Sequence, residues 1–404
     1  MTMDTVLTAI GVLGAVVASL SARIRRLPVS EPLMGLLIGI LLGRQVSGLL
    51  PLPTLLDDHA LIHEATRLLL AVSVMSVALR YPIAEARKQR RPVFILLLVA
   101  MPAMAFVTAG LTWALLGVSV AAAALLGAAV CPTDPVLASS VVTGEPAEHD
   151  LPARDRQVLS LESGANDGLA LPFVLVAIAL AGPLTGTDAL LESVWQVLAA
   201  IVVGVSAGWL AAHALRIGEE HGATDTEPAL LFTLLLALGV LGAAGLLKAD
   251  GILAVFAAGL AFNYASTRGD RAGAVSIDEA INRFAVLPVF LLFGAMLPWE
   301  VWADLGWQGP ALAVAVLVLR RVPLLLLIRR TLKMERPDAL YLGWFGPVGV
   351  SALFYLTLEA DRLGVDPVVL GAGALVVAAS TVAHGVTSAP GRLLYRRAAH
   401  EPRS

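Results

Sequence analysis

The sequence predicts an all-α membrane protein that crosses the bilayer many times. Of its 404 residues, 58% are hydrophobic and only 15% are charged, and the mean hydropathy is +0.82. A water-soluble protein of this length needs more charged surface, whereas lipid-facing side chains need none. The apolar residues also gather in runs near the roughly 20 residues that span a bilayer as a helix.

About thirteen apolar runs are separated by short charged or Pro- and Gly-containing stretches. Gly and Pro also recur inside several runs, which membrane helices tolerate when neighbouring helices satisfy the freed backbone groups. The connections are too short to fold alone, so we expect 1–404 to form one membrane domain with a short cytoplasmic tail at 389–404. The expected helices are 4–22, 30–50, 60–80, 93–116, 118–144, 157–182, 188–215, 228–247, 250–265, 279–299, 309–331, 338–358 and 366–388.

The first run is interpreted as a spanning helix rather than a secretory signal. Met1 to Asp4 lack the basic flank of a signal peptide, and a second apolar run follows soon after. The only cysteine, Cys131, excludes an intramolecular disulfide.

The distribution of basic residues predicts the orientation in the membrane. Alternate loops and the tail hold 22 Lys and Arg residues, while the opposite loops hold only Arg44, Lys248 and Arg362. Because cytoplasmic loops are enriched in Lys and Arg, we expect the N-terminus outside and the C-terminus in the cytoplasm of a cell (inner) membrane.

Two interrupted helices suggest an internal repeat. Six helices (4–182), a linking helix (188–215) and six more (228–388) would form an inverted repeat. The fifth helix of each half is interrupted, at 132–135 (PTDP) and at 346–349 (GPVG). Paired broken helices that cross at the membrane midplane are typical of transporters with an ion site there, because unwinding exposes carbonyls and helix ends.

Few ionisable side chains fall inside the predicted spans, where each is unfavourable by about 2.5–3.5 kcal/mol on insertion. Asp134 lies at the first interruption, and the next run carries ESGAND from Glu162 to Asp167. Helical spacing places Ser163 on the same face as Asp167, and it places Asn166 on the same face as Glu162. These side chains are therefore the candidates for a site.

Two interpretations of Asp134 and Asp167 are open. In the structural one, each acid pairs with an arginine and holds helices together. In the functional one, at least one acid stays unpaired and alternately holds a proton and a cation. Thr133, Ser163 and Asn166 supply the neutral oxygen ligands that hard alkali ions accept. The functional interpretation places an alkali cation at Asp167.

Arg320 and Arg321 interrupt a run of Leu and Val. A pair between Glu162 and one of them would fix the helix of 157–182 against that of 309–331. Adjacent helical residues point about 100° apart, so only one arginine can face Glu162; Arg320 is the expected partner and Arg321 the alternative.

Asp250 lies at the turn between the runs 228–247 and 250–265, on the side with few basic residues. A surface turn and an outer access funnel for ions are both compatible with this position.

The motifs resemble those of the monovalent cation:proton antiporter-1 (sodium/proton exchanger) family, in particular the fungal plasma-membrane Na⁺(K⁺)/H⁺ antiporters and their bacterial relatives. They follow the family order over most of the chain. The matching strings are CPTDPVLASSVV from Cys131, LESGANDGLALPFV from Leu161, DGILAVFAAGLAFN from Asp250, SIDEAINRFAVLPVFLLFGAMLPW from Ser276, LRRVPLLLL from Leu319 and GWFGPVGVSALFY from Gly343.

The resemblance implies a homodimer in which a six-helix core moves as an elevator against a dimerisation part. It implies that Asp167 carries the cation and the proton, and that the same site is lined by Thr133, Asp134, Asn166 and Ser163. The resemblance also implies the pairing of Glu162 with an arginine of the expected helix 309–331.

This sequence departs from the family pattern in two places. Many members have Arg where Val348 stands, so any role of that arginine is absent here. The fungal relatives tend to have two acids where this chain has Ala249-Asp250, which weakens the funnel interpretation.

The expected function is exchange of Na⁺, K⁺ or Li⁺ for H⁺ by alternating access, with the bilayer as environment and without enzymatic activity, cofactor or nucleic acid. A sodium-coupled symporter of an organic anion on a related fold is the first alternative. An intramembrane hydrolase is disfavoured because Ser163 has no histidine on its own or an adjacent helix. A channel is the third alternative.

Overall fold

The regular structure is helical throughout the described part of the chain. The computed structural model describes residues 3–19, 30–142, 145–182, 184–221, 226–266 and 285–400. No strand is present within these ranges; one isolated β-bridge joins Gly43 to Leu50. The predicted all-α class is confirmed.

Several helices are long and apolar enough to cross a bilayer, by length and composition. In the described ranges six are of full length: Ala60–Arg80, Arg90–Leu116, Ala153–Ala181, Gly186–Gly218, Gln308–Ile328 and Pro367–Ala398. Shorter apolar helices accompany them: Asp4–Val17, Glu31–Leu42, Val120–Ala129, Leu231–Leu246, Gly251–Ala265 and Ala285–Ala295.

The elements follow one another along the chain with short connections. They are α1 (Met3–Ser19), α3 (Glu31–Leu42), α4 (Ala60–Arg80), α5 (Ile83–Lys88), α6 (Arg90–Ile95), the π-helical turn η1 (Leu96–Ala100), α7 (Met101–Leu116), α8 (Val120–Ala129), α9 (Pro135–Val142), α10 (Glu145–Asp150), α11 (Ala153–Leu169), α12 (Leu171–Ala181), α13 (Gly186–Glu220), α14 (Thr226–Leu246), α15 (Gly251–Ala265), α17 (Trp299–Asp304), α18 (Gln308–Leu319), α19 (Val322–Ile328), α20 (Arg336–Trp344), α21 (Val350–Leu363) and α22 (Pro367–His400).

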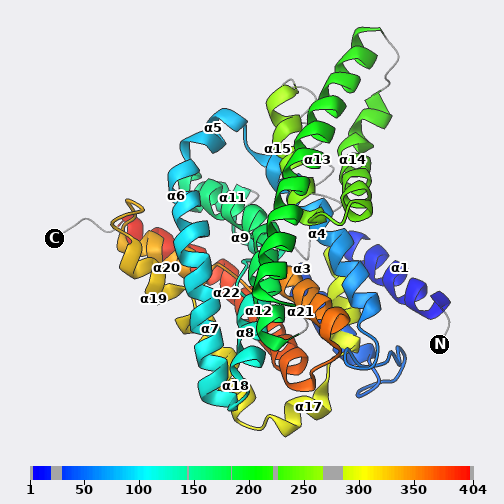
Figure 1. Cartoon of the computed structure of the whole chain (residues 1–404), viewed down its shortest axis with the longest axis vertical. Helices are drawn as coiled ribbons and strands as arrows, with labels where there is room; N and C mark the ends of the chain where they lie inside the picture. Colours follow the sequence, from blue (N-terminus) through cyan, green and yellow to red (C-terminus); the bar gives the residue numbers. More distant parts are fainter. Residues whose placement is uncertain are drawn as a thin grey trace.

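The helices pack in two bundles. In the first bundle α13 and α15 run along each other, both contact α14, and α15 and α14 pack on α4; α13 and α14 lie side by side and project beyond the rest (Figure 1). In the second bundle α7, α8, α12, α18, α21 and α22 contact one another, with α9, α11, α19 and α20 at its centre and end. The bundles meet where α21 packs on α4, α11 on α15 and α12 on α13.

Both predicted interruptions are present in the structure. The expected helix 118–144 divides into α8 and α9, and the expected helix 338–358 divides into α20 and α21. Proline lacks a backbone N–H and clashes with the preceding turn, so Pro132 and Pro347 end helical pairing at these points. The helix expected at 309–331 also divides, between Arg320 and Arg321, where Pro323 follows in the first turn of α19.

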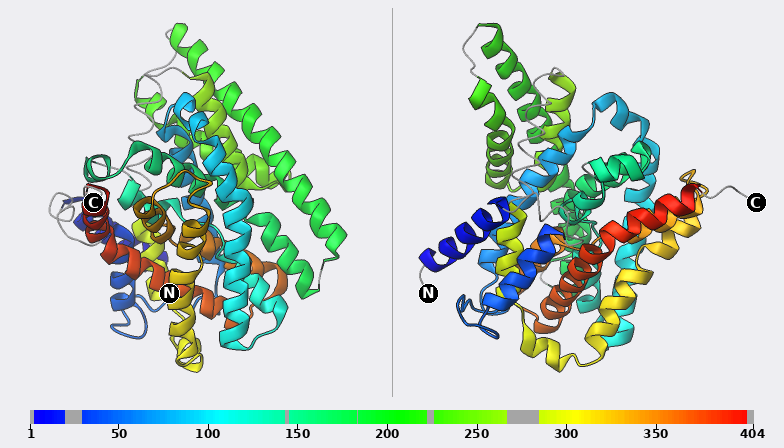
Figure 2. Two further views of the ribbon diagram at one scale, coloured as in Figure 1. Left: turned by 90° about the vertical axis from the view of Figure 1, so that its left-hand side faces the viewer. Right: turned by 180° about the vertical axis from the view of Figure 1, so that it is seen from behind.

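Helix ends differ from the prediction in two places. The helix expected over 30–50 ends at Leu42, because Gly43 turns extended and residues 44–59 form turns. The helix expected over 366–388 continues to His400 as α22, so the expected tail at 389–404 is mostly helical; its long course is seen in Figure 2.

Some expectations lie partly outside the described residues. The helix expected at 279–299 is described as a helix over Ala285–Ala295, and its earlier part lies outside. The basic loops at 23–26 and 268–283 also lie outside the described residues.

Small residues bring α13 and α15 into close contact. A Cβ atom on Gly204 would overlap the carbonyl oxygen of Ala254, and one on Gly208 would overlap that of Ala258. The two glycines are four residues apart and so share one helix face. This small-xxx-small pattern on each helix allows the backbones to approach.

We expect Gly208→Ala to lower the thermal midpoint in detergent, because the added methyl must push α13 away from α15. Such overpacking costs about 1–3 kcal/mol. Gly110→Ala on α7 is the matched control, because its added methyl has nothing within 4 Å; the higher helix propensity of alanine should leave stability equal or up to about 1 kcal/mol higher. Equal midpoints for both variants would contradict the close contact.

Candidate functional site

The two helix interruptions cross each other inside the second bundle. The backbone N–H of Asp134 donates to the carbonyl of Pro347 at 3.0 Å, which joins the first break to the second. α8 and α20 each end at this crossing, and α9 and α21 each begin there. Four helix ends therefore point their dipoles and unpaired backbone groups at one small region.

Asp134 caps both of the helices that begin at the crossing. One carboxylate oxygen accepts the N–H of Val136 at 2.6 Å and the N–H of Leu137 at 3.1 Å, at the start of α9. The other oxygen accepts the N–H of Val350, the first residue of α21. A carboxylate at a helix N-terminus is stabilised by the dipole and by these donors. Asp134 thus ties the two breaks together.

Arg320 stabilises the two helices that end at the crossing, α8 and α20. Its guanidinium donates to the carbonyls of Val130 and, at 3.1 Å, Pro132, which follow α8. It also donates to the carbonyl of Gly346 at 2.6 Å, after α20. The positive charge therefore lies at two helix C-termini, where the dipoles favour it.

Glu162 pairs with Arg321, and the expectation of Arg320 as its partner is wrong. The Arg321 guanidinium makes two parallel bonds to the carboxylate, Nη1 to Oε1 at 2.8 Å and Nη2 to Oε2 at 2.9 Å, with both side chains buried. Because the helix breaks between the two arginines, Arg320 points into the crossing and Arg321 points at α11. This pair joins α11 to α19.

Thr133, Ser163 and Asn166 form one hydrogen-bonded group beside this ion pair. The amide of Asn166 donates to the Thr133 hydroxyl at 2.8 Å and to Glu162 at 3.0 Å. Its carbonyl oxygen accepts the N–H of Thr133 at 3.2 Å, and the Thr133 and Ser163 hydroxyls are 2.9 Å apart. The group is fully buried and fixes the first break against α11.

Asp167 differs from the other acids of the site. Its side chain is fully buried, and neither carboxylate oxygen makes a hydrogen bond within the described part of the chain. The Ser351 side chain lies next to it. An unpaired carboxylate buried in this way is stable only when it holds a proton or a cation.

Tyr355 holds the backbone of α11 at this point. Its hydroxyl donates to the backbone carbonyl of Asp167. Ser351 and Tyr355 are one turn apart on α21, so the same helix face touches both the side chain and the backbone of Asp167. Sequence reasoning missed both residues; their spacing of four within GVSALFY was the available signal.

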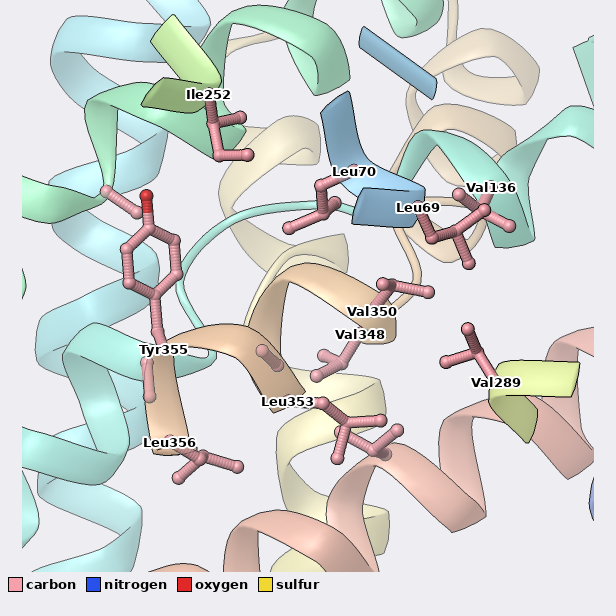
Figure 3. Packing of buried hydrophobic residues seen from close by; sticks show 14 of the residues in the cluster. Leu69, Leu70, Val136, Ile252, Val289, Val348, Val350, Leu353, Tyr355 and Leu356 are labelled. Carbon is pink, nitrogen blue, oxygen red and sulfur yellow. The ribbon is translucent and has the colours of Figure 1, made fainter. Parts of the chain in front are cut away.

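Apolar side chains cover the crossing on the side of the first bundle. Figure 3 shows Leu69 and Leu70 of α4, Val136 of α9 and Val289 gathered around Val350 at the start of α21. All five are buried. The site is therefore closed to solvent on this side, at the contact between the two bundles.

A small pocket lies beside Tyr355, between the bundles. It measures about 110 Å³ and is lined by Asp250, Arg67 and Gln196 of the first bundle and by Tyr355 of the second. One Asp250 oxygen accepts the N–H of Leu253 at 2.9 Å, as the N-cap of α15. Its other oxygen has no hydrogen bond within the described residues.

Glu359 is a buried acid that the sequence analysis missed. It is 3% exposed, and neither carboxylate oxygen has a hydrogen-bond partner among the described residues. The predicted span ended at residue 358, whereas α21 continues to Leu363. Its spacing of four from Tyr355 and eight from Ser351 could have placed it on the same helix face.

The pair of Glu162 with Arg321 predicts a specific pattern of stability loss. Arg321→Ala should lower the free energy of unfolding by about 3–5 kcal/mol, because it leaves Glu162 charged, buried and unpaired. The double variant Glu162→Ala/Arg321→Ala should lose less than the sum of the single losses. Thermal midpoints in detergent measure this. Arg320→Ala is the control: its coupling with Glu162→Ala should be weaker than that of Arg321→Ala, and a stronger coupling for Arg320 than for Arg321 would refute the assigned pair.

Together these features define a class of protein. A helical membrane bundle in which two broken helices cross beside a buried, unpartnered carboxylate has the architecture of a secondary ion transporter. The chain belongs to the sodium/hydrogen exchanger family: the family model "Sodium/hydrogen exchanger, transmembrane" matches residues 12–391.

Curated relatives are fungal. The chain is 32% identical to the Na(+)/H(+) antiporter 2 of Zygosaccharomyces rouxii over 318 residues, which covers 74% of this chain and 39% of the relative. It is 29% identical to the Na(+)/H(+) antiporter of Saccharomyces cerevisiae over 321 residues, covering 76% of this chain and 32% of the relative. The chain thus spans well under half the length of these two relatives.

The fold is that of a solved antiporter. The structure superimposes on that of the sodium proton antiporter MjNhaP1 from Methanocaldococcus jannaschii with a TM-score of 0.80, at 19% sequence identity and over the whole of both chains.

Proposed function

We propose that this protein exchanges Na⁺, or K⁺ or Li⁺, for protons, with Asp167 as the carboxylate that both ions share. The observation that carries the proposal is the state of Asp167: its two oxygens are buried where two broken helices cross, and they have no hydrogen-bond partner among the residues that the structure describes. Such a group must bind a positive ion to be stable in that place. Family membership and relatives described as Na(+)/H(+) antiporters favour the same reaction.

The neighbouring residues supply ligands and positioning for a small cation. Ser351 lies next to the Asp167 carboxylate, and Ser163 is one helical turn before Asp167 on α11. Thr133 and Asn166 hold the break of α8 and α9 in place, and they offer further neutral oxygens. Carboxylate, hydroxyl and carbonyl oxygens are the ligand types that hard cations prefer. Asp134 positions the two breaks through three backbone donors rather than by binding the cation directly.

Alternating access by an elevator movement fits the division into two bundles. The second bundle holds the residues of the crossing, and Leu69 and Leu70 of α4 face it with apolar side chains (Figure 3). Polar contacts between the bundles lie toward the two ends of α4: His59 pairs with Asp361, His63 bonds Thr357, and Arg80 bonds Ser160. In the proposed movement these end contacts break, and the second bundle carries Asp167 from one membrane side to the other. The pocket at Asp250 and Tyr355 is then the outer funnel to the site.

In the proposed orientation the protein lies in the cell membrane with its N-terminus outside and its C-terminus in the cytoplasm, as the basic loops indicate. The protein forms a homodimer through the first bundle.

A proton-gradient assay in proteoliposomes tests the exchange. Purified protein is reconstituted, an acidic interior is established, and recovery of a quenched pH dye is followed on adding Na⁺, K⁺ or Li⁺ separately. An antiporter dissipates the gradient with at least one of them, and the order of the three gives the preferred cation. A symporter of an organic anion would show no recovery without that anion. Failure with all three cations would refute the proposed exchange.

A further inference from the structure

A large pocket opens on the second bundle, next to the Asp250 pocket, with which it shares Arg362. It measures about 750 Å³ and is lined by the first turns of α8, the end of α12, the last turns of α21 and the start of α22. Ser119, Ala181 and Arg362 at its rim are exposed. Because these are helix ends of spanning segments, the mouth faces the aqueous phase rather than lipid.

Glu359 lies in the wall of this pocket as a buried acid without a partner. Both of its oxygens are inaccessible and unbonded within the described residues. α8, α12 and α22 contribute no charged side chain to the lining; the other charged residues there are Arg362 and Asp366. Arg362 pairs with Glu192 of α13 at 3.0 Å, and Asp366 caps α22 by accepting the N–H groups of Val368 and Val369. Neither neutralises Glu359.

One face of α21 connects Glu359 to the ion site. Ser351, Tyr355 and Glu359 follow at intervals of four, so they form one stripe along the helix. Ser351 lies next to the Asp167 carboxylate, and Tyr355 bonds the Asp167 carbonyl. Eight residues correspond to about 12 Å along the helix axis, a distance that hydroxyls and a few waters can bridge.

We propose that Glu359 is a proton-relay carboxylate between the 750 Å³ pocket and Asp167. A hydrated proton from the pocket binds the Glu359 carboxylate. When the cation leaves Asp167, a proton passes inward along water and the Ser351 hydroxyl, which accepts one proton and releases another. Asp167 becomes neutral, Glu359 becomes the anion, and pocket water protonates it again. Protons would then reach Asp167 through Glu359, whereas the cation would enter past Asp250. This inference rests on the proposed exchange.

The transport test compares three variants in proteoliposomes. Glu359→Gln should lower the maximal exchange rate about tenfold, since a positioned proton-transfer group contributes at least that much. The loss should be greatest when the pocket side is alkaline, while the apparent Na⁺ affinity stays within about twofold because Asp167 is intact. Glu359→Asp should restore most of the rate. Asp366→Asn is the matched control, since it changes an exposed acid of the same pocket and should exchange normally.

Two results would overturn the relay. One is a wild-type rate for Glu359→Gln at every pH; the other is an equal, pH-independent loss in Glu359→Gln and Glu359→Asp, which would mean a purely structural role. If wild-type protein itself shows no cation-driven proton flux, the proposed exchange fails instead.

A second measurement uses unmodified protein and does not depend on transport. A small apolar carbodiimide reacts with protonated carboxyl groups in apolar surroundings, and the modified residue can be located by mass spectrometry. Glu359 should be modified at acid pH, and raising the pH on the pocket side should suppress the modification, because the carboxyl group exchanges its proton with pocket water. If modification of Glu359 does not change with pH, the pocket does not exchange protons with it and the inference is wrong.

Discussion

Replacement of Asp167 by asparagine is expected to abolish cation-driven proton flux, to the level of empty vesicles. Asparagine has nearly the shape of aspartate but can neither release a proton nor supply a negative charge to a cation. Because the Asp167 oxygens accept no hydrogen bond in the described structure, the substitution removes no such contact. The thermal midpoint should therefore stay equal or rise, since a buried ionisable group without a partner has been removed.

Asp134→Asn gives the contrasting result that separates the two acids. Asp134 uses both oxygens to accept backbone N–H groups of α9 and α21. Asparagine keeps one acceptor and turns an NH₂ group toward the remaining donor, so a buried N–H loses its partner at a cost of about 1–3 kcal/mol. This variant should be less stable as well as poorly active. Normal exchange by a well-folded Asp167→Asn protein would rule out Asp167 as the carrier.

The sequence predicted the structure well at residue types whose effect does not depend on tertiary packing. Proline cannot continue helical hydrogen bonding, so PTDP and GPVG located both breaks within a few residues. An acid inside a span is rare and unfavourable, so Asp134, Glu162 and Asp167 stood out as site residues. The structure brings all three to the crossing.

The choice between Arg320 and Arg321 could not be made from the sequence. The choice depends on the break between α18, which ends at Leu319, and α19, which begins at Val322, because this break sets the directions of the two arginine side chains. In a continuous helix the two side chains would point about 100° apart, but the sequence does not say which of the two directions leads to Glu162. Only the packed position of α11 supplies that direction.

Glu359 was missed for a related reason. An apolar run ends in the sequence where charged residues begin, so hydropathy predicts that the span ends at Leu358, before EAD. The helix itself continues to Leu363, and it packs against α8 and α22. Burial by tertiary contacts decides whether such an acid faces water, and hydropathy along the chain does not contain that information.

Competition between protons and cations is the second large effect expected of a shared carboxylate. A proton must leave Asp167 before Na⁺ or K⁺ can bind, so protons and cations exclude each other. In the acid range, where the protonated form dominates, the apparent cation affinity should weaken about tenfold for each unit that pH falls. The maximal rate at saturating cation should change little there, because enough cation still displaces the proton.

The full dependence on pH should be a bell whose acid limb moves. At alkaline pH the rate falls because reloading Asp167 with a proton becomes slow, while at acid pH it falls because protons occupy the site. More cation competes better, so the acid limb must shift to lower pH as the cation concentration rises. Flux measured over a grid of pH and Na⁺ concentration shows this directly.

A separate proton-sensing group would give an acid limb that stays fixed at all Na⁺ concentrations, since cation binding at Asp167 would not displace the inhibitory proton from that other group. An acid limb fixed in this way would eliminate the shared-carboxylate mechanism, even if Asp167→Asn is inactive.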